Sequence, residues 1–126
     1  MIVGIGTDIV RVARLESAFA RFGARYAERI LGATELDEFA TTARRGHFLA
    51  KRFAAKEAAA KALGTGFRGA FGLRDIVVDH DPLGGPRLVL GGGARVRAET
   101  LLVTRIHVSL SDEEEYAVAL VILEAA

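Results

Sequence analysis

The chain has 126 residues, of which 51% are apolar and 26% charged, and its 17 basic and 16 acidic side chains leave a formal net charge of +1. This length fits a single domain, residues 1–126, with its own hydrophobic core, and the composition excludes a disordered chain. The absence of cysteine excludes a disulfide scaffold, a thiolate nucleophile and a thiolate zinc site. The balanced charge argues against a protein whose whole surface binds nucleic acid.

The sequence carries no pattern typical of a targeting or membrane segment. Its start, MIVGIGTD, has no basic region before an apolar run and reaches an aspartate early. The longest apolar run, Tyr116 to Leu123, is much shorter than the roughly 20 residues that span a bilayer. We therefore expect a cytoplasmic protein that does not bind membranes.

The first predicted elements are a strand and a long amphipathic helix. Ile2 to Ile5 reads as a short buried strand that Gly6 ends. Apolar residues recur with helical period from Val12 to Arg29, which predicts one helix with a buried stripe. The opposite side of that helix carries an arginine ridge: Arg14, Arg21 and Arg25.

The middle of the chain predicts a short helix, a long helix and a loop. Thr34 is a candidate cap for a short helix that runs toward Ala43. The segment from His47 to Leu63 is rich in good helix formers and is followed by Gly64, a typical residue at a helix C-terminus. The stretch GTGFRGAFG, residues 64–72, has four glycines in nine residues and predicts a loop whose backbone can approach a ligand closely.

The last part of the chain predicts two hairpins around a further helix. Asp75 to Asp79 and Arg87 to Leu90 flank a turn and form the first hairpin. Gly91 to Leu102 is expected to be a helix, and Arg105 to Ser111 pairs with Tyr116 to Glu124 in the second hairpin. The predicted class is α+β, a small antiparallel sheet packed against helices.

Two carboxylates are candidates for chemistry, and each also has a plain structural interpretation. Asp8 follows the first strand, where a helix N-cap is the simpler role and a magnesium ligand the alternative. Glu57 and Lys61 are spaced as an ordinary exposed ion pair on a helix. However, their helix face also includes Phe53 and runs directly into the glycine-rich loop, which favours an anion site.

His107 lies on one face of a predicted strand with Ser109 and Ser111. A hydrogen-bonded structural histidine is the simpler interpretation. A serine hydrolase is disfavoured because neighbours on one strand cannot build its catalytic geometry and no Gly-x-Ser-x-Gly elbow is present. The spacing of the three histidines also disfavours a histidine zinc site.

Three segments together resemble the holo-acyl-carrier-protein synthases, the small trimeric 4'-phosphopantetheinyl transferases. They are GIGTDIVRVARLE, FLAKRFAAKEAAAKALGTGFRG and IHVSLSDEEEYAVALVI, and GPRLVL fits as well. The resemblance implies an α+β fold, a homotrimer, and coenzyme A bound between neighbouring subunits. It also implies transfer of the phosphopantetheine arm of coenzyme A to a serine of an acyl carrier protein, for fatty-acid or polyketide synthesis, with release of adenosine 3',5'-bisphosphate.

The same resemblance assigns roles to residues of this chain. Asp8 and Glu57 would be the Mg²⁺ ligands, and Lys61 would neutralise phosphate charge. From the charge that such a reaction develops, Glu57 is also our candidate base, acting directly or through a metal-bound water. The coenzyme A contacts would be Arg52, Phe53, Lys61, Gly64, Thr65, Gly66, Pro86, Arg87 and His107. The arginine ridge would receive the acidic carrier protein. One departure is Asp112, where many relatives have histidine, so the role of that position is open.

Two other classes of protein remain as alternatives. One is a catalytically idle nucleotide- or phosphate-binding module that uses the glycine-rich loop and Lys61. The other is a small RNA-binding domain that uses the arginine ridge, although the net charge and the absence of tryptophan argue against it. Magnesium-dependent turnover separates the transferase from the first alternative, and salt-sensitive RNA binding would identify the second.

Overall fold

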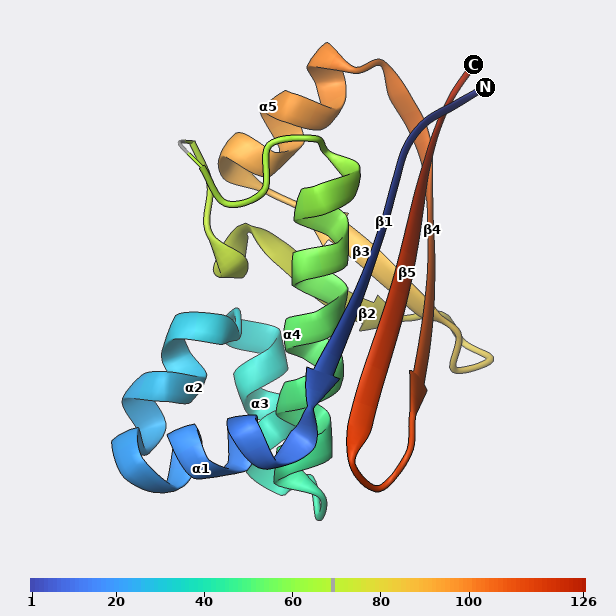
Figure 1. Ribbon diagram of the computed structural model, residues 1–126. Helices are drawn as coiled ribbons and strands as arrows, with labels where there is room; N and C mark the ends of the chain where they lie inside the picture. The colour runs from blue at the N-terminus through green and yellow to red at the C-terminus, as the bar shows by residue number, and fades with distance from the viewer. Residues whose placement is uncertain (69) are drawn as a thin grey trace.

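The computed structural model describes residues 1–68 and 70–126; Gly69, which falls in the expected glycine-rich loop, lies outside the described residues. The fold is built around one long helix, α4 (Arg45–Ala62), as Figure 1 shows. Seven of its alanines are buried, so neighbouring elements approach its backbone closely.

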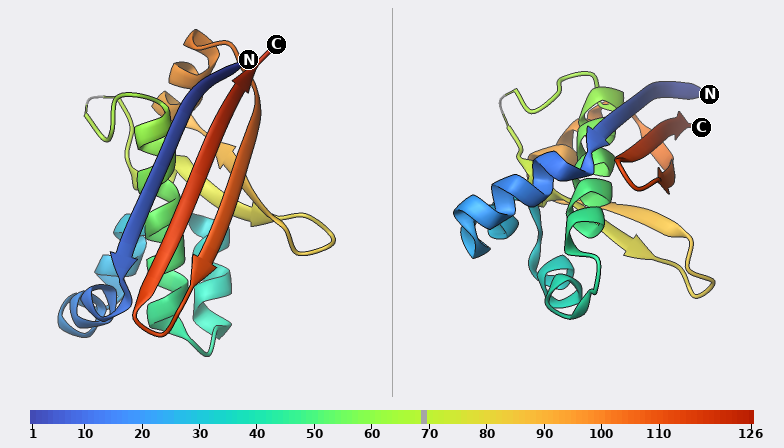
Figure 2. Two further views of the ribbon diagram at one scale, coloured as in Figure 1. Left: turned by 45° about the vertical axis from the view of Figure 1, so that its right-hand side comes forward. Right: turned by 60° about the horizontal axis from the view of Figure 1, so that its bottom comes forward.

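A three-stranded antiparallel sheet covers one side of α4. Its strand order is β1 (Ile2–Arg11), β5 (Tyr116–Ala125) and β4 (Val103–Asp112). The strands lie side by side in Figure 2, and β1 and β5 both pack on α4. The predicted C-terminal hairpin is therefore confirmed, and β1 joins its free side.

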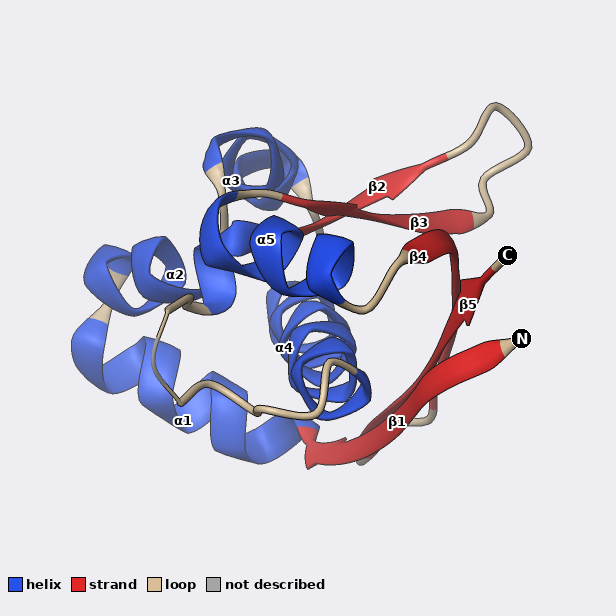
Figure 3. Cartoon of the chain, turned by 90° about the horizontal axis from the view of Figure 1, so that it is seen from above, coloured by secondary structure: helices blue, strands red, loops and turns tan. Residues whose placement is uncertain are grey.

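Helices and a second, smaller sheet surround the rest of α4. The helices are α1 (Val12–Phe22), α2 (Ala24–Ile30), α3 (Ala33–Thr41) and α5 (Gly92–Thr100). A 3₁₀ turn, η1 (Leu73–Asp75), leads into the two-stranded hairpin of β2 (Ile76–His80) and β3 (Pro86–Leu90). Seen from above in Figure 3, α4 stands between β1 on one side and the β2–β3 hairpin on the other. The α+β class and the first hairpin are confirmed.

The first strand is longer than the sequence indicated. Strand β1 runs through Gly6 to Arg11, and Asp8 lies within it opposite Ala119 of β5. The residue before α1 is Arg11, with no side-chain cap, so Asp8 is not the N-cap of that helix. The pattern of apolar residues did not show the full length of β1, because the strand carries glycines on the face that packs against α4.

The predicted helix from Val12 to Arg29 is two helices. Gly23 adopts φ 65°, a left-handed conformation that ends α1 and redirects the chain into α2. Arg25 therefore lies on a different helix from Arg14 and Arg21, and the three do not share one helix face. The apolar residues that recur with helical period from Val12 to Arg29 include Phe22, which was therefore expected to be buried but is 56% exposed.

The start of α3 also differs from the prediction. The residue before it is Gly32, not Thr34, and the Gly32 amide donates a hydrogen bond of 3.0 Å to Oε1 of Glu35. Glu35 is fully buried although it is charged. Over residues 1–68 and 70–126, no helix is both long enough and apolar enough to cross a bilayer.

Candidate functional site

Asp8 and Lys61 meet where β1 crosses the last turns of α4. Asp8 lies on the face of β1 that packs against the helix, between buried Gly6 and Val10. The ammonium of Lys61 donates hydrogen bonds to Asp8 Oδ1 at 3.1 Å and to the carbonyl of Thr7 at 2.9 Å. The Asp8 side chain is only 16% exposed, whereas Lys61 is half exposed, so the pair opens to solvent from the lysine side.

Glu57 faces the same place from one turn earlier on α4. Burial raises the pKa of the Glu57 carboxyl, and the charge of Asp8 raises it further, while Lys61 and Arg14 act in the opposite direction. Strand β1 contacts α4 at Ala58 and Lys61 through Gly6, and Asp8 lies two residues farther along the same strand face, so it is near the α4 turn that carries Glu57. Two carboxylates from distant parts of the chain converge beside one ammonium group.

This donor set fits a magnesium ion. Magnesium usually takes one or two protein carboxylates and completes its octahedron with water and substrate phosphates. Asp8 and Glu57 supply two, and in the described part of the chain no cluster of three or more acidic, histidine or cysteine side chains forms a closed site. Burial and, to a smaller extent, the charge of Asp8 raise the pKa of Glu57, and a divalent cation bound between the two carboxylates would offset both effects.

The glycine-rich loop begins at the end of α4, one turn beyond Lys61. Gly64 and Gly66 have φ of 84° and 57°, which explains why glycine is needed at both positions. Thr65 between them is partly buried. The sequence analysis missed Arg97 of α5, which donates a hydrogen bond of 2.9 Å to the Leu63 carbonyl and lies beside Gly64. Nothing in the sequence pattern linked Arg97 to this loop.

The arginine ridge starts at the carboxylate pair. The guanidinium carbon of Arg14 lies 5.2 Å from the ring centroid of Phe53, which precedes Glu57 by one turn of α4. Arg21 is exposed farther along α1. Arg25 lies across the break between the helices, in a hollow of about 340 Å³ that it forms with Phe22, Tyr26 and Arg29. This aromatic part of the surface was not anticipated.

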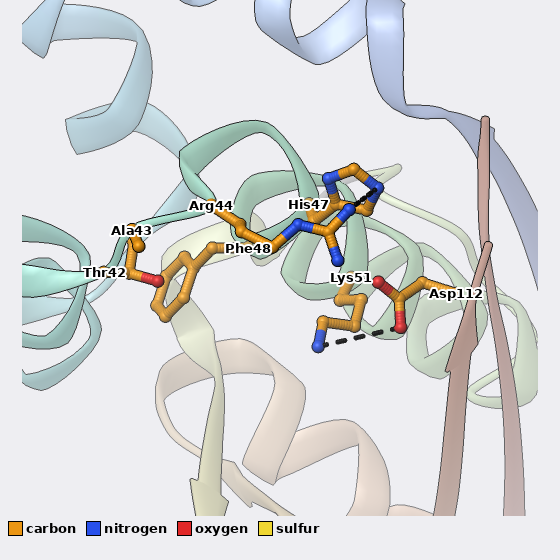
Figure 4. Close-up of a pocket in the computed structure, with 7 residues that line it drawn as sticks. All are labelled: Thr42, Ala43, Arg44, His47, Phe48, Lys51 and Asp112. Atoms are coloured by element: carbon orange, nitrogen blue, oxygen red, sulfur yellow. Dashed lines mark hydrogen bonds and ion pairs between the residues drawn. The ribbon is translucent and has the colours of Figure 1, made fainter. Parts of the chain in front are cut away.

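A second basic hollow lies at the other end of α4. It measures about 330 Å³ and is shown in Figure 4. Its lining residues are Thr42, Ala43, Arg44, His47, Phe48, Lys51 and Asp112. Lys51 lies 3.9 Å from Asp112, and Arg44 lies 3.1 Å from the His47 ring. Arg44 also binds Glu114 at 3.3 Å, so both basic side chains of the hollow are paired with carboxylates. No motif in residues 41–47 had indicated this hollow.

The Arg52 side chain does not take part in the site formed by Asp8, Glu57 and Lys61. Its side chain is 6% exposed, and its guanidinium binds Glu35 at 3.3 Å and Glu38 at 3.1 Å. It also donates a hydrogen bond of 3.1 Å to the carbonyl of Val78. The expected contact between Arg52 and coenzyme A therefore does not fit this placement, because the guanidinium is buried and its hydrogen bonds are used internally.

Three other expected contact residues are separate from the carboxylate pair within one chain. Pro86 and Arg87 are the first two residues of β3, in the two-stranded sheet, whereas Asp8 belongs to the three-stranded sheet. Arg87 binds Asp79 at 3.0 Å. His107 pairs with Glu124 at 2.5 Å on the outer face of the sheet, whereas Asp8 is on the inner face.

Comparison with known proteins identifies the class of this fold and site. Residues 4–121 match the family model of the 4'-phosphopantetheinyl transferase superfamily, and the chain belongs to that superfamily. The holo-acyl-carrier-protein synthase of Halorhodospira halophila is 58% identical over 123 residues, and that of Vibrio cholerae serotype O1 (strain M66-2) is 53% identical over 124 residues; each match covers 98% of both chains. Within the superfamily, the chain falls among the holo-acyl-carrier-protein synthases.

Solved structures agree with this placement. The crystal structure of the holo-acyl-carrier-protein synthase from Neisseria meningitidis superimposes with a TM-score of 0.91 at 46% identity, covering 98% of this chain and 99% of that one. The enzyme from Bacillus anthracis, solved in complex with CoA (3',5'-ADP), gives a TM-score of 0.82 at 38% identity and covers 100% and 99%. The family resemblance stated from the sequence is confirmed.

Proposed function

We propose that this chain transfers the 4'-phosphopantetheine arm of coenzyme A to a serine hydroxyl of an acyl carrier protein, and that Asp8 and Glu57 hold the Mg²⁺ this reaction uses. The observation that carries the residue assignment is the convergence of these two carboxylates beside Lys61 and the glycine-rich loop. The relatives support the reaction, since they are holo-acyl-carrier-protein synthases over their full length. We place this activity in fatty-acid synthesis in the cytoplasm.

The residues at this site would act mainly by position and charge. Bound Mg²⁺ would supply a second positive centre that neutralises the diphosphate of coenzyme A. Lys61 extends its ammonium from the same helix face, and the loop of Gly64, Thr65 and Gly66 offers backbone that a phosphate can approach. Phosphoryl transfer depends mostly on such positioning and charge stabilisation.

Proton removal from the attacking serine falls to Glu57 in this proposal. Glu57 shares the site with Asp8 and Lys61, where its carboxylate is placed to accept the proton of the attacking serine. The serine oxygen attacks the phosphorus that bears the pantetheine arm, and the bond to the bridging oxygen breaks. The proton is left with the protein, and adenosine 3',5'-bisphosphate leaves with the bridging oxygen.

We infer that a complete coenzyme A site needs two subunits of a homotrimer. In one chain Pro86 and Arg87 belong to the separate two-stranded sheet and His107 is exposed on the outer face of the other sheet, so a neighbouring copy would have to bring these residues to the carboxylate pair. The outer face of the sheet is suited to self-association: Ile5 and Ile9 of β1 are 64% and 63% exposed, and Val118 and Leu120 of β5 lie beside them. A contiguous exposed apolar face of this kind is typical of an interface.

The carrier protein would dock on the arginine ridge. Arg14 contacts Phe53 next to the carboxylate pair, and Arg21 continues the positive surface away from it. Arg25 adds charge beside the aromatic hollow on α2. An acidic helix of the carrier protein that binds along these arginines would have one end near Glu57. Exposed charges of this kind mainly increase the rate at which the two proteins associate.

The test of the reaction is mass spectrometry of an unmodified carrier protein after incubation with this chain, coenzyme A and Mg²⁺. We expect the carrier to gain the mass of one phosphopantetheine arm, and the gain to disappear when EDTA replaces Mg²⁺. Glu57→Gln should bind the carrier protein but give no product. A chain that binds coenzyme A without modifying any carrier tested would instead be the idle binding module.

A further inference from the structure

Three charged side chains are buried together between α3, α4 and β2. Glu35 and Lys56 are fully buried and Arg52 is 5% exposed; we call these three residues the Glu35 cluster. Burial of charge is costly unless every charged group is paired and hydrogen-bonded. In the described part of the chain no buried side-chain polar atom lacks a hydrogen-bond partner, so the cluster meets this condition.

The Glu35 carboxylate is the centre of the cluster. Its Oε1 accepts hydrogen bonds from Lys56 Nζ at 2.6 Å and from the Gly32 amide at 3.0 Å. Its Oε2 accepts from Arg52 Nη1 at 3.3 Å and from the Val78 amide at 3.2 Å. The last of these bonds leaves the helices and reaches strand β2.

The cluster binds both backbone polar groups of Val78. Glu35 accepts from the Val78 amide, and Arg52 donates to the Val78 carbonyl at 3.1 Å. Lys56 adds a third backbone bond, to the carbonyl of Leu73 just before β2, at 3.1 Å. On its other edge Val78 pairs with Leu88 of β3. Two side chains therefore occupy the edge of β2 where a third strand would otherwise pair.

β2 and β3 form a sheet of two strands only, which is held both by the packing of fully buried Ile76 and Val78 in the core and by the backbone hydrogen bonds of the Glu35 cluster. A lone two-stranded hairpin is marginally stable in water. The anchored residue is directly followed by Asp79, which pairs with Arg87 in register and by an ion pair of 3.0 Å. The position of Arg87 is thus set one residue beyond the point where the Glu35 cluster holds β2.

We propose that the Glu35 cluster positions the β2–β3 hairpin so that Pro86 and Arg87 can contact coenzyme A. Arg52 and Glu35 are then positioning residues that act through Val78 and do not touch the substrate themselves. This inference rests on the proposed function, in which the hairpin contributes to the coenzyme A site. It gives Arg52 a role in coenzyme A binding that its buried placement allows.

The experiment compares Glu35→Gln with Glu38→Gln in the full-length protein. Glu38 also accepts a hydrogen bond from Arg52, at 3.1 Å, but its side chain is 46% exposed and it has no bond to β2. The readouts are amide hydrogen exchange of β2 and β3, the Kd for coenzyme A by calorimetry, and KM for each substrate. In Glu35→Gln we expect faster exchange at Val78 and about tenfold weaker coenzyme A binding, the factor typical of one lost charge-assisted hydrogen bond.

The pattern across substrates separates positioning from general stability. Glu35→Gln should raise KM for coenzyme A and leave KM for the carrier protein unchanged, while Glu38→Gln should change neither. Arg52→Lys serves as a second variant because it keeps the charge near Glu35 but lacks the planar guanidinium whose Nη1 binds Glu35 and Val78 while its Nη2 binds Glu38. It should show the same selective loss.

Several results would overturn the inference. One is a folded Glu35→Gln or Arg52→Lys protein with the coenzyme A affinity of the parent. Another is loss of folding in both variants, which would assign the cluster to stability alone. Arg87→Ala separates this inference from the proposed function: unchanged coenzyme A binding in that variant removes the hairpin from the site, whereas weakened binding in Arg87→Ala but not in Glu35→Gln rejects only the positioning role.

Discussion

Gly6 is the position where the smallest change should separate the two carboxylates. Strand β1 lies directly against the backbone of α4, and a Cβ atom at Gly6 would sit 2.0 Å from the carbonyl oxygen of Ala58 and 2.7 Å from the amide nitrogen of Ala62. Both neighbours are main-chain atoms inside a helix and cannot turn aside as a flexible side chain would. In Gly6→Ala the strand must therefore move away from the helix.

The size of this movement follows from the contact distance. The separation of 2.0 Å has to grow to about 3.4 Å, where ordinary van der Waals contact begins. Asp8 is two residues from Gly6 on the same face of β1, so it moves with the strand and away from Glu57 and Lys61. Overpacking of this kind costs about 1–3 kcal/mol of stability. A displacement of about 1 Å in a catalytic group can lower the rate about 10²-fold.

The assay measures kcat/KM, the Mg²⁺ concentration that gives half-maximal activity, and the melting temperature. Gly4→Ala is the matched control, because a Cβ there would lie 2.1 Å from the Ala62 carbonyl oxygen, but Gly4 is two residues farther from Asp8. We expect similar losses of stability in the two variants. Gly6→Ala should lose much more activity than Gly4→Ala and should need a higher Mg²⁺ concentration for half-maximal activity. Normal activity in Gly6→Ala, or equal activity losses in both variants, would refute the reasoning.

The remaining predictions concern the carrier surface, the carboxylate pair and the sheet. Arg21→Glu should raise KM for the carrier protein at low salt and leave the Kd for coenzyme A unchanged; Arg95→Glu, on α5, is the control, and equal effects of the two would argue against docking on the arginine ridge. Glu57→Gln should abolish turnover yet raise the melting temperature at neutral pH in EDTA, because the raised pKa of Glu57 means that its charged form costs stability. This difference should shrink as the pH falls through the folded-state pKa and Glu57 takes up its proton, and a difference that persists in acid would contradict the assignment. Val118→Arg should reduce the mass measured by analytical ultracentrifugation and lower activity, whereas an unchanged mass would exclude the sheet face as the interface.

The elements that the sequence predicted well are those with a strong local signal. The long alanine-rich helix, the two hairpins and the glycine-rich loop were all expected near their observed positions, because propensity, alternation and glycine content are properties of neighbouring residues. The break at Gly23 was missed since apolar periodicity continues across it from α1 into α2. A single glycine inside a helical pattern is often tolerated, so Gly23 alone did not indicate that the helix ends there.

The candidate site was predictable in its members more than in its geometry. The motifs named Asp8, Glu57 and Lys61, and the structure brings these three together at the crossing of β1 and α4. The motifs also named Arg52, whose neighbours Glu35 and Val78 lie 17 and 26 residues away. A pattern of residue types could not show that its guanidinium is buried among them.

The sequence alone determined the fold class, the family and the two acidic residues of the site, because each is written in local composition, periodicity or a motif. Only the tertiary structure decided that Asp8 lies within a strand, that Arg52 is buried, and that Pro86 and Arg87 belong to a different sheet from Asp8. The physical reason is that direction and burial depend on which surfaces pack together. Here the close approach of two glycines to the α4 backbone sets the geometry, and that contact joins residues more than 50 positions apart.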